Sequence, residues 1–165
     1  MSSRPICGSS VINKIVSGGQ TGADRAALDC AMGLGFTVGG WCPKGRRAED
    51  GRIAGHYPLI ETESRNYAVR TRWNARDSDG TLILSPMPLT GGTALTMSLA
   101  ESQKKPVLCI DLNQAENAQI RFAEWIAEHR IRVLNVAGPR ASSDPQLYDR
   151  CLKLLKNLLG PFVPA

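Results

Sequence analysis

The fold is decided by a stretch near the start of the chain, residues 11–30, which reads VINKIVSGGQTGADRAALDC. The apolar run over residues 11–16 predicts a buried strand, and a glycine-rich turn follows it at once. Over residues 22–34, apolar side chains recur at intervals of three and four, which predicts a helix. Thr21 and Asp24 form a T-x-x-D pattern that predicts a capping box at the start of this helix. A strand, a glycine turn and a helix in this order are typical of a parallel α/β sheet.

The same alternation continues to the end of the chain. We expect further strands over residues 36–41, 58–60, 81–84, 107–110 and 132–136, and helices over residues 66–76, 92–104, 115–130 and, after an N-cap pair at Asp144 and Pro145, to about residue 158. A polar loop is expected over residues 42–57. The pattern predicts a Rossmann-like α/β fold, a mostly parallel sheet with helices on both faces. Residues 1–10 are expected to form a flexible N-terminal lead, and residues 11–165 a single ligand-binding domain.

Composition limits the partners of the protein. The 165 residues carry a formal net charge of +5, which suits an anionic ligand, but no lysine and arginine run is dense enough to predict nucleic-acid binding. No signal peptide and no membrane-crossing stretch are apparent, so we expect a cytoplasmic protein without a membrane partner. The five cysteines (Cys7, Cys30, Cys42, Cys109 and Cys151) form no C-x-x-C pair, which argues against a disulfide framework or a zinc site.

Ligands of open α/β sheets bind beyond the carboxyl ends of the strands, and two glycine-rich loops lie at such ends. The loops Ser17–Arg25 and Ser85–Thr93 each lead into a helix and combine glycines with hydroxyl groups. Glycines let an anion approach the backbone closely, and a helix N-terminus supplies free N–H groups. We expect a phosphate or another anion to lie between residues 18–22 and 90–93, with both loops leaving adjacent strands and both helix N-termini pointing at it. Substitution of Gly19 or Gly91 by valine should then abolish binding and leave the fold intact.

Two other loops could add positive charge to this site. In the loop Trp41–Gly51, Lys44 and Arg46 could bind phosphate and Trp41 could stack on a heterocycle, although a solvated charged loop explains the same residues equally well. Arg140, in the loop after the last strand, is a third cation with an ordinary loop as its alternative. The candidate ligand-binding residues are Ser17, Gly18, Gly19, Gln20, Thr21, Gly22, Arg25, Trp41, Lys44, Arg46, Ser85, Thr90, Gly91, Gly92, Thr93 and Arg140.

No catalytic constellation is apparent in the sequence. There are two histidines, and no Ser-His-Asp spacing stands out. Asp77 and Asp79, with Asn74 nearby, could ligate a metal, but acidic residues before a glycine at a helix-to-strand turn are more typical of turn chemistry. The sequence therefore favours a binding protein over an enzyme, and we assign no catalytic and no metal-ligating residue.

Several motifs together resemble the molybdenum carrier, or molybdenum cofactor carrier, protein family. They are residues 17–29, residues 43–46 and 48–51, Arg70-Thr71 with Asn74, residues 77–83, Gly91-Gly92-Thr93 and residues 135–140. The resemblance implies a Rossmann-like protein, related to the Lonely Guy phosphoribohydrolases, that binds the molybdenum cofactor as cargo, protects it and transfers it without catalysis. This cofactor is a pterin with a phosphate and a dithiolene-held metal. Molybdoenzymes or cofactor-synthesis proteins are the implied partners, and we expect a homo-oligomer, a dimer or tetramer.

Two other functions stay open beside the carrier. The related enzymes carry P-G-G-x-G-T-x-x-E, whose glutamate is needed for nucleotide cleavage, whereas this chain has Ser98 or Thr96 where the acid belongs, and Glu101 lies one helical turn further on. That departure argues against a nucleoside monophosphate phosphoribohydrolase. A nucleotide-sensing module that reports to a protein partner is the remaining alternative.

Overall fold

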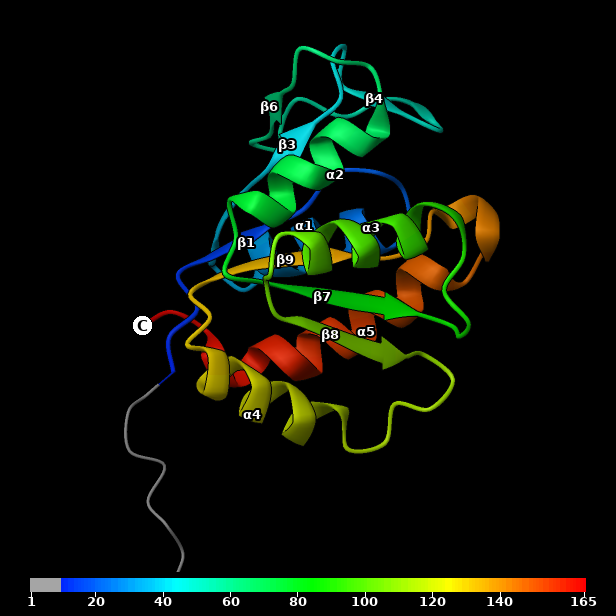
Figure 1. Cartoon of the computed structure of the whole chain (residues 1–165). Helices are drawn as coiled ribbons and strands as arrows, with labels where there is room; N and C mark the ends of the chain where they lie inside the picture. Colours follow the sequence, from blue (N-terminus) through cyan, green and yellow to red (C-terminus); the bar gives the residue numbers. More distant parts are fainter. Residues whose placement is uncertain (1–9) are drawn as a thin grey trace, which may run out of the picture.

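The centre of the molecule is a sheet of five parallel strands (Figure 1). The computed structural model describes residues 10–165, so the expected lead over residues 1–10 lies outside the described residues apart from Ser10. The strands are β1 (Lys14–Val16), β2 (Thr37–Gly39), β7 (Gly80–Ser85), β8 (Val107–Asp111) and β9 (Val133–Ala137). Every residue of β7 is buried, which is why this strand appears in the sequence as a continuous apolar run.

Helices cover both faces of this sheet (Figure 1). On one face lie α1 (Ala23–Gly33), α4 (Ala118–His129) and α5 (Leu147–Leu159), and α5 contacts both of the other two. The main core lies between these helices and the sheet, with Ile15, Phe122 and Leu155 fully buried in it. On the other face, α2 (Tyr67–Arg76) contacts α3 (Gly91–Ser102). The predicted Rossmann-like class is confirmed, and no helix in residues 10–165 is long and apolar enough to cross a membrane.

The strand order is β2-β1-β9-β7-β8, so the last strand of the chain lies in the middle of the sheet. Ile15 of β1 is paired with Leu134 of β9, and Thr81 of β7 is paired with Asn135 on the other side of β9. The expectation that the loops after β1 and β7 leave adjacent strands is therefore wrong. The loop after β9 emerges between them, because β9 occupies the position that adjacency would require.

The segment between β2 and α2 folds into two small sheets, where mostly a polar loop was expected. β3 (Trp41–Cys42) pairs in parallel with β6 (Ile60–Glu61), and β4 (Arg47–Ala48) pairs antiparallel with β5 (Gly51–Arg52). We call residues 41–62 the small-sheet layer. A second core of buried residues lies between this layer and α1: Leu28, Cys42, Ala48, Ile53, Tyr57 and Leu59. Irregular spacing of these apolar residues hides the layer from a periodicity search.

A glycine separates the small-sheet layer from the main sheet. Gly40 has φ +132°, and a Cβ at this position would lie 2.3 Å from the carbonyl oxygen of Ser17. Only glycine permits this close approach, so the strand expected over residues 36–41 ends at Gly39 and a new strand begins at Trp41.

Neither of the two predicted helix caps forms as expected. Helix α1 has Gly22 at its N-cap and no side-chain cap, because the Thr21 hydroxyl donates to Glu49 and accepts from the Ala141 N–H at 3.1 Å. The predicted capping box is therefore wrong. Helix α5 begins at Leu147 rather than at Pro145, since the Asp144 carboxylate accepts the Gln146 N–H at 2.9 Å in a turn before the helix.

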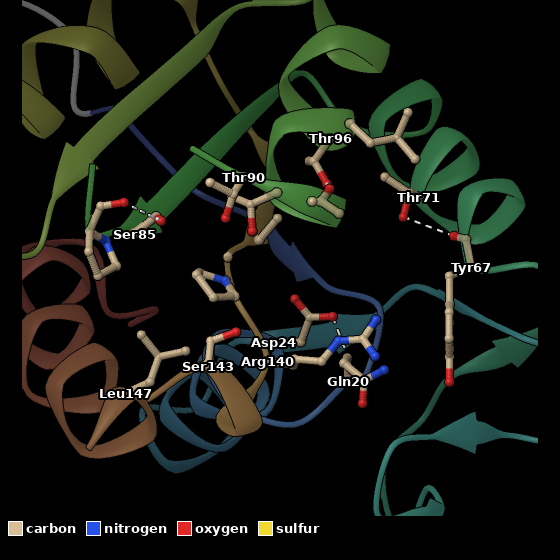
Figure 2. Close-up of a pocket in the computed structure, with 18 of the residues that line it drawn as sticks. Gln20, Asp24, Tyr67, Thr71, Ser85, Thr90, Thr96, Arg140, Ser143 and Leu147 are labelled. Atoms are coloured by element: carbon tan, nitrogen blue, oxygen red, sulfur yellow. Dashed lines mark hydrogen bonds between the residues drawn. The ribbon is translucent and has the colours of Figure 1, made fainter. Parts of the chain in front are cut away.

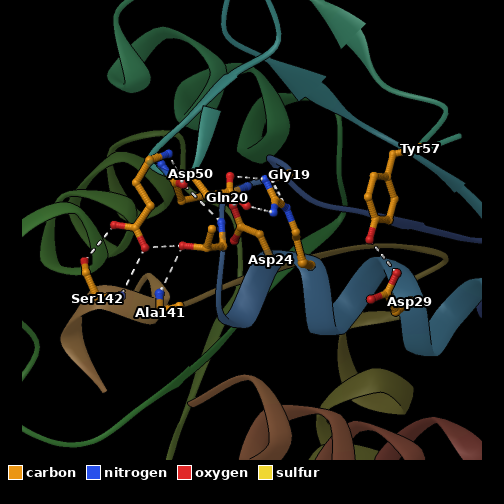
Figure 3. A network of polar contacts seen from close by, with 11 residues as sticks. Gly19, Gln20, Asp24, Asp29, Asp50, Tyr57, Ala141 and Ser142 are labelled. Carbon is orange, nitrogen blue, oxygen red and sulfur yellow. Dashed lines mark hydrogen bonds and ion pairs between the residues drawn. The ribbon is translucent and has the colours of Figure 1, made fainter. Parts of the chain in front are cut away.

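Asp29 of α1 joins the small-sheet layer to α5. It accepts a hydrogen bond from the Tyr57 hydroxyl at 2.7 Å, as Figure 3 shows, and another from the Tyr148 hydroxyl. Burial, followed by the bond to Asp29, raises the pKa of Tyr57 from 10.0 to about 12. The same two causes raise the pKa of Tyr148.

These raised pKa values predict alkaline sensitivity. Because the folded-state pKa of Tyr57 exceeds its unfolded value, this contribution to stability is complete below about pH 10 and is lost as the pH rises toward 12. We expect Tyr57→Phe to lose about 1 kcal/mol of unfolding free energy at pH 8. Between pH 10 and 12, the unfolding free energy of this variant should fall by less than that of the parent protein. Urea unfolding across this pH range measures both effects, and equal declines for the two proteins would contradict the assignment. Tyr67→Phe is the matched control, because the Tyr67 hydroxyl makes no hydrogen bond within residues 10–165.

Candidate functional site

A cavity of about 490 Å³ opens at the carboxyl ends of the central strands (Figure 2). The loops after β1, β7 and β9 contribute to its wall, and α2 closes one side. Its volume falls in the range of small-molecule sites. The polar and glycine residues that line it are Gln20, Asp24, Tyr67, Arg70, Thr71, Ser85, Thr90, Gly91, Gly92, Thr93, Thr96, Gly138, Arg140, Ser143 and Asp144.

The N-terminus of α3 faces this cavity. Its first three residues, Gly91, Gly92 and Thr93, all line the wall, and the N-cap residue Thr90 makes no side-chain cap. The first N–H groups of a helix have no partner inside the helix, and together they carry about half a positive charge. A Cβ built at Gly92 would meet no atom within 4 Å, so the approach to these N–H groups is open.

The N-terminus of α1 is arranged differently. The Ala23 N–H donates to the carbonyl oxygen of Pro139 at 3.2 Å, and a Cβ at Gly22 would lie 2.6 Å from that same oxygen. The loop after β9 therefore packs directly onto the start of α1. The expectation of two helix N-termini aimed at one anion is wrong, because α1 uses this N–H group to hold the loop.

A buried ion pair lies in the cavity wall between α1 and α2. The Arg70 guanidinium lies 3.2 Å from the Asp24 carboxylate, which also accepts the Gln20 N–H at 3.2 Å. Asp24 is 3% exposed, and burial raises the pKa of its carboxyl group although Arg70 opposes this. A Cβ at Gly18 would lie 1.9 Å from the Arg70 guanidinium, so this glycine makes room for the arginine.

Cations also surround Tyr67. The guanidinium carbon atoms of Arg47, Arg70 and Arg140 lie 4.8, 5.9 and 5.3 Å from the centre of the Tyr67 ring. Arg140 lines the cavity, and among the acids of residues 10–165 it contacts Glu49 alone, at the long distance of 3.9 Å. Since Arg70 is paired with Asp24 and Arg47 does not line the cavity, Arg140 is the cation best placed to bind an anion there.

The structure brings together seven of the residues predicted to bind the ligand. Those that line the cavity are Gln20, Ser85, Thr90, Gly91, Gly92, Thr93 and Arg140. Two more lie directly behind its wall. Gly18 supports Arg70, and the buried Ser17 hydroxyl donates to the Val136 carbonyl oxygen at 2.7 Å.

The other predicted residues do not line the cavity, and most hold the small-sheet layer in place (Figure 3). Thr21 is bonded to Glu49, which also accepts from Ser142, and Arg25 pairs with Asp50. Gly19 packs against the layer: a Cβ there would lie 2.6 Å from a Leu59 methyl carbon.

The three predicted residues of the second loop have other surroundings. The Trp41 ring packs edge-on against Trp73, and its indole N–H donates to Asp77 at 2.7 Å. Lys44 is exposed, and Arg46 turns inward, where four carbonyl oxygens of the layer accept its N–H groups. These positions leave stacking by Trp41 and phosphate binding by Arg46 without support from the geometry.

The acidic turn before β7 also has structural partners. The Asp79 carboxylate accepts the N–H groups of Arg132 and Val133, at 3.0 and 2.8 Å. The Asn74 amide donates to and accepts from the backbone of Trp41. Within residues 10–165, no group of three or more histidine, cysteine or acidic side chains is placed to hold a metal ion.

Sequence reasoning missed Asp24, Tyr67, Arg70 and Thr96 as cavity residues. Asp24 was assigned to a helix cap, and the expected site had no acid. A stripe of polar residues on α2, in which Tyr67, Thr71 and Asn74 recur at intervals of four and three, was the available signal. Polar side chains on the inner face of a helix indicate a polar cavity or a buried network.

Comparison with known proteins agrees with this fold. A model of the circularly permutated YpsA SLOG family matches residues 15–159. The chain belongs to this family. It is also similar to the crystal structure of a "Putative molybdenum carrier protein" from Syntrophus aciditrophicus SB, with 49% sequence identity and a TM-score of 0.87, covering 94% of this chain and 97% of that one. The predicted resemblance to molybdenum carrier proteins is confirmed. No curated protein matches the chain.

Proposed function

We propose that this protein binds a phosphorylated small molecule, with the phosphate at the N-terminus of α3. The observation that carries the proposal is the row Gly91-Gly92-Thr93, which presents uncapped N–H groups to a cavity that also contains Arg140. A dianionic phosphate is the group that such N–H donors and a guanidinium bind best. Pro86, Met87 and Leu95 provide an apolar wall suited to a ring system.

The ligand that we propose is the molybdenum cofactor, carried as cargo. Similarity to a protein described as a molybdenum carrier supports this choice. The described residues offer no cluster of metal ligands, so the protein would hold the phosphate and the pterin and leave the metal centre to the cofactor's own dithiolene. Protection and transfer to a molybdoenzyme or a cofactor-synthesis protein follow from this role. A cytoplasmic homo-oligomer remains our expectation.

Binding is tested by mass spectrometry of molecules that co-purify with the protein and by calorimetric titration. We expect a phosphate-bearing pterin in the first measurement. In the second, inorganic phosphate should bind, and its affinity should weaken several-fold as the salt concentration rises, because charge-assisted contacts to Arg140 are screened. A titration without heat at low salt would exclude the phosphate site.

Asp24 favours a second candidate, the nucleoside monophosphate phosphoribohydrolase. The glutamate of the related enzymes is absent from α3. However, Asp24 of α1 places a carboxyl group with a raised pKa in the same cavity. We still expect no release of free base from nucleoside 5′-monophosphates, since Arg70 and Gln20 occupy one oxygen of this carboxylate. Chromatographic detection of base release on the order of 1 per second would favour the enzyme.

A further inference from the structure

The two oxygen atoms of the Asp24 carboxylate differ in the hydrogen bonds that they accept. Its Oδ2 atom accepts from the Gln20 N–H and from Arg70, while Oδ1 accepts no hydrogen bond from the side chains and backbone of residues 10–165. The Ser17 hydroxyl lies beside Asp24, but its proton is donated to the Val136 carbonyl oxygen at 2.7 Å. Asp24 can therefore accept from N–H groups of a ligand.

Two buried donors without acceptors lie next to this acid. The Gln20 Oε1 atom accepts the N–H groups of Thr21 and Glu49, at 3.0 and 2.9 Å, which fixes the orientation of the amide. Its Nε2 atom then has no acceptor in the part of the chain that the structure describes, although Gln20 is only 5% exposed and lines the cavity. The Nε atom of Arg70 is likewise buried, and no atom of residues 10–165 accepts its hydrogen. A buried donor left unpaired is costly, so both groups call for an acceptor that residues 10–165 do not supply.

We infer that Asp24, Gln20 and Arg70 form a subsite for the edge of a 2-amino-4-oxo-pyrimidine ring, the edge that pterins and guanine share. On that edge an amino group and a ring N–H stand side by side, and a carbonyl group follows them. The Oδ1 atom of Asp24, with its two lone pairs, accepts from the amino group and the ring N–H, and the carbonyl oxygen accepts from Gln20 or Arg70. This inference rests on the proposed function, because it assigns the ring of the same ligand whose phosphate lies at α3.

The chemistry of this wall also excludes related rings. A ring with a carbonyl group in place of the amino group presents an acceptor to the Asp24 carboxylate, and the two would repel each other. Rejection of this kind discriminates strongly, since it leaves buried polar groups unpaired. Asp24 is thus a specificity-determining residue for the ring, and the α3 N-terminus remains the site of the phosphate.

Fluorescence titration with pterin and with lumazine, which has oxygen in place of the 2-amino group, tests the inference without any phosphate. We expect the parent protein to bind pterin at least ~10-fold more tightly than lumazine. In Asp24→Asn, this preference should fall to about twofold or less, because the amide oxygen would face the Gln20 N–H and Arg70 and the amide NH2, a donor, would face the ring. Asp50→Asn, which changes an acid outside the cavity, is the matched control and should keep the preference of the parent.

The ring titrations and the phosphate titration test the ring subsite and the phosphate site separately. Equal affinity of the parent for pterin and lumazine would overturn the inference, whether or not inorganic phosphate binds. Absence of phosphate binding with a retained pterin preference would instead remove the proposed phosphate site. If Asp24→Asn does not fold, the affinities of the parent protein for pterin and lumazine still test the inference. A second pair of ligands, guanosine and inosine 5′-monophosphates, identifies the ring system. If the affinity ratio of pterin to lumazine is the larger, the subsite fits pterin better; if the ratio of the guanosine to the inosine nucleotide is the larger, it fits guanine better.

Discussion

Replacement of Gly92 by valine is expected to abolish phosphate binding and leave the protein folded. Gly92 is the second residue of α3, it lines the cavity, and a Cβ there meets no atom within 4 Å. Its φ lies outside the left-handed region, so valine can adopt the backbone conformation. The isopropyl group would cover the N–H groups of the first helical turn and keep the phosphate away. Loss of two charge-assisted hydrogen bonds weakens affinity by ~100-fold or more.

Calorimetric titration with inorganic phosphate measures this loss, and thermal unfolding confirms that the variant is folded. Gly33→Val is the matched control, because Gly33 ends α1 on the exposed surface and its added Cβ also meets nothing within 4 Å. It should bind phosphate like the parent. Parent-like binding by Gly92→Val would place the phosphate elsewhere in the cavity.

The structure also explains why Gly92 is a better test than the two glycines chosen from the sequence. Gly19 has φ +79°, and its added Cβ would lie 2.6 Å from Leu59 and 2.9 Å from Ile53. Valine there would displace the small-sheet layer, so the expectation of an intact fold is wrong for this position. Gly91 has φ +53°, which strains valine although the space around it is open.

Arg46→Met is expected to destabilise the protein by about 3–5 kcal/mol. Arg46 is 8% exposed, and its guanidinium donates to the carbonyl oxygens of Ile53, Ala54, Tyr57 and Leu59 at 2.7–3.2 Å. These carbonyl groups belong to a segment with little regular structure of its own, so the arginine takes the place of a strand as their hydrogen-bond partner. Methionine fills a similar volume but leaves the carbonyl oxygens of Ile53 and Leu59 without a donor, and those of Ala54 and Tyr57 with only a backbone N–H each.

Urea unfolding compares Arg46→Met with Arg52→Met, an exposed arginine of the same layer that should cost less than about 0.5 kcal/mol. Arg46→Lys should also destabilise, since a single ammonium group cannot span four carbonyl oxygens. A stable Arg46→Met protein that has lost phosphate affinity would restore the role first predicted for this residue. A stable variant with normal affinity would contradict both roles.

The cavity became recognisable only in part from the sequence. The row Gly91-Gly92-Thr93 was identifiable because a glycine turn between a buried strand and a helix has a local meaning. Arg140 was identifiable as a cation at a strand end. Asp24 and Arg70 were not, since their significance depends on a contact between α1 and α2 across 46 positions of sequence. Arg46 was misread for the same reason, because nothing local shows whether a guanidinium points outward to an anion or inward to carbonyl groups.

The sequence by itself determined the alternation of strands and helices, because burial on both faces gives parallel strands continuous apolar runs and gives their covering helices a periodicity of three and four. It also determined that glycine loops lie at the carboxyl edge of the sheet. Only the tertiary structure decided that β9 lies between β1 and β7, which sets the loop of Arg140 between the two glycine loops. Strand order depends on pairings between residues far apart in the chain, such as Ile15 with Leu134, and such pairings leave no local pattern.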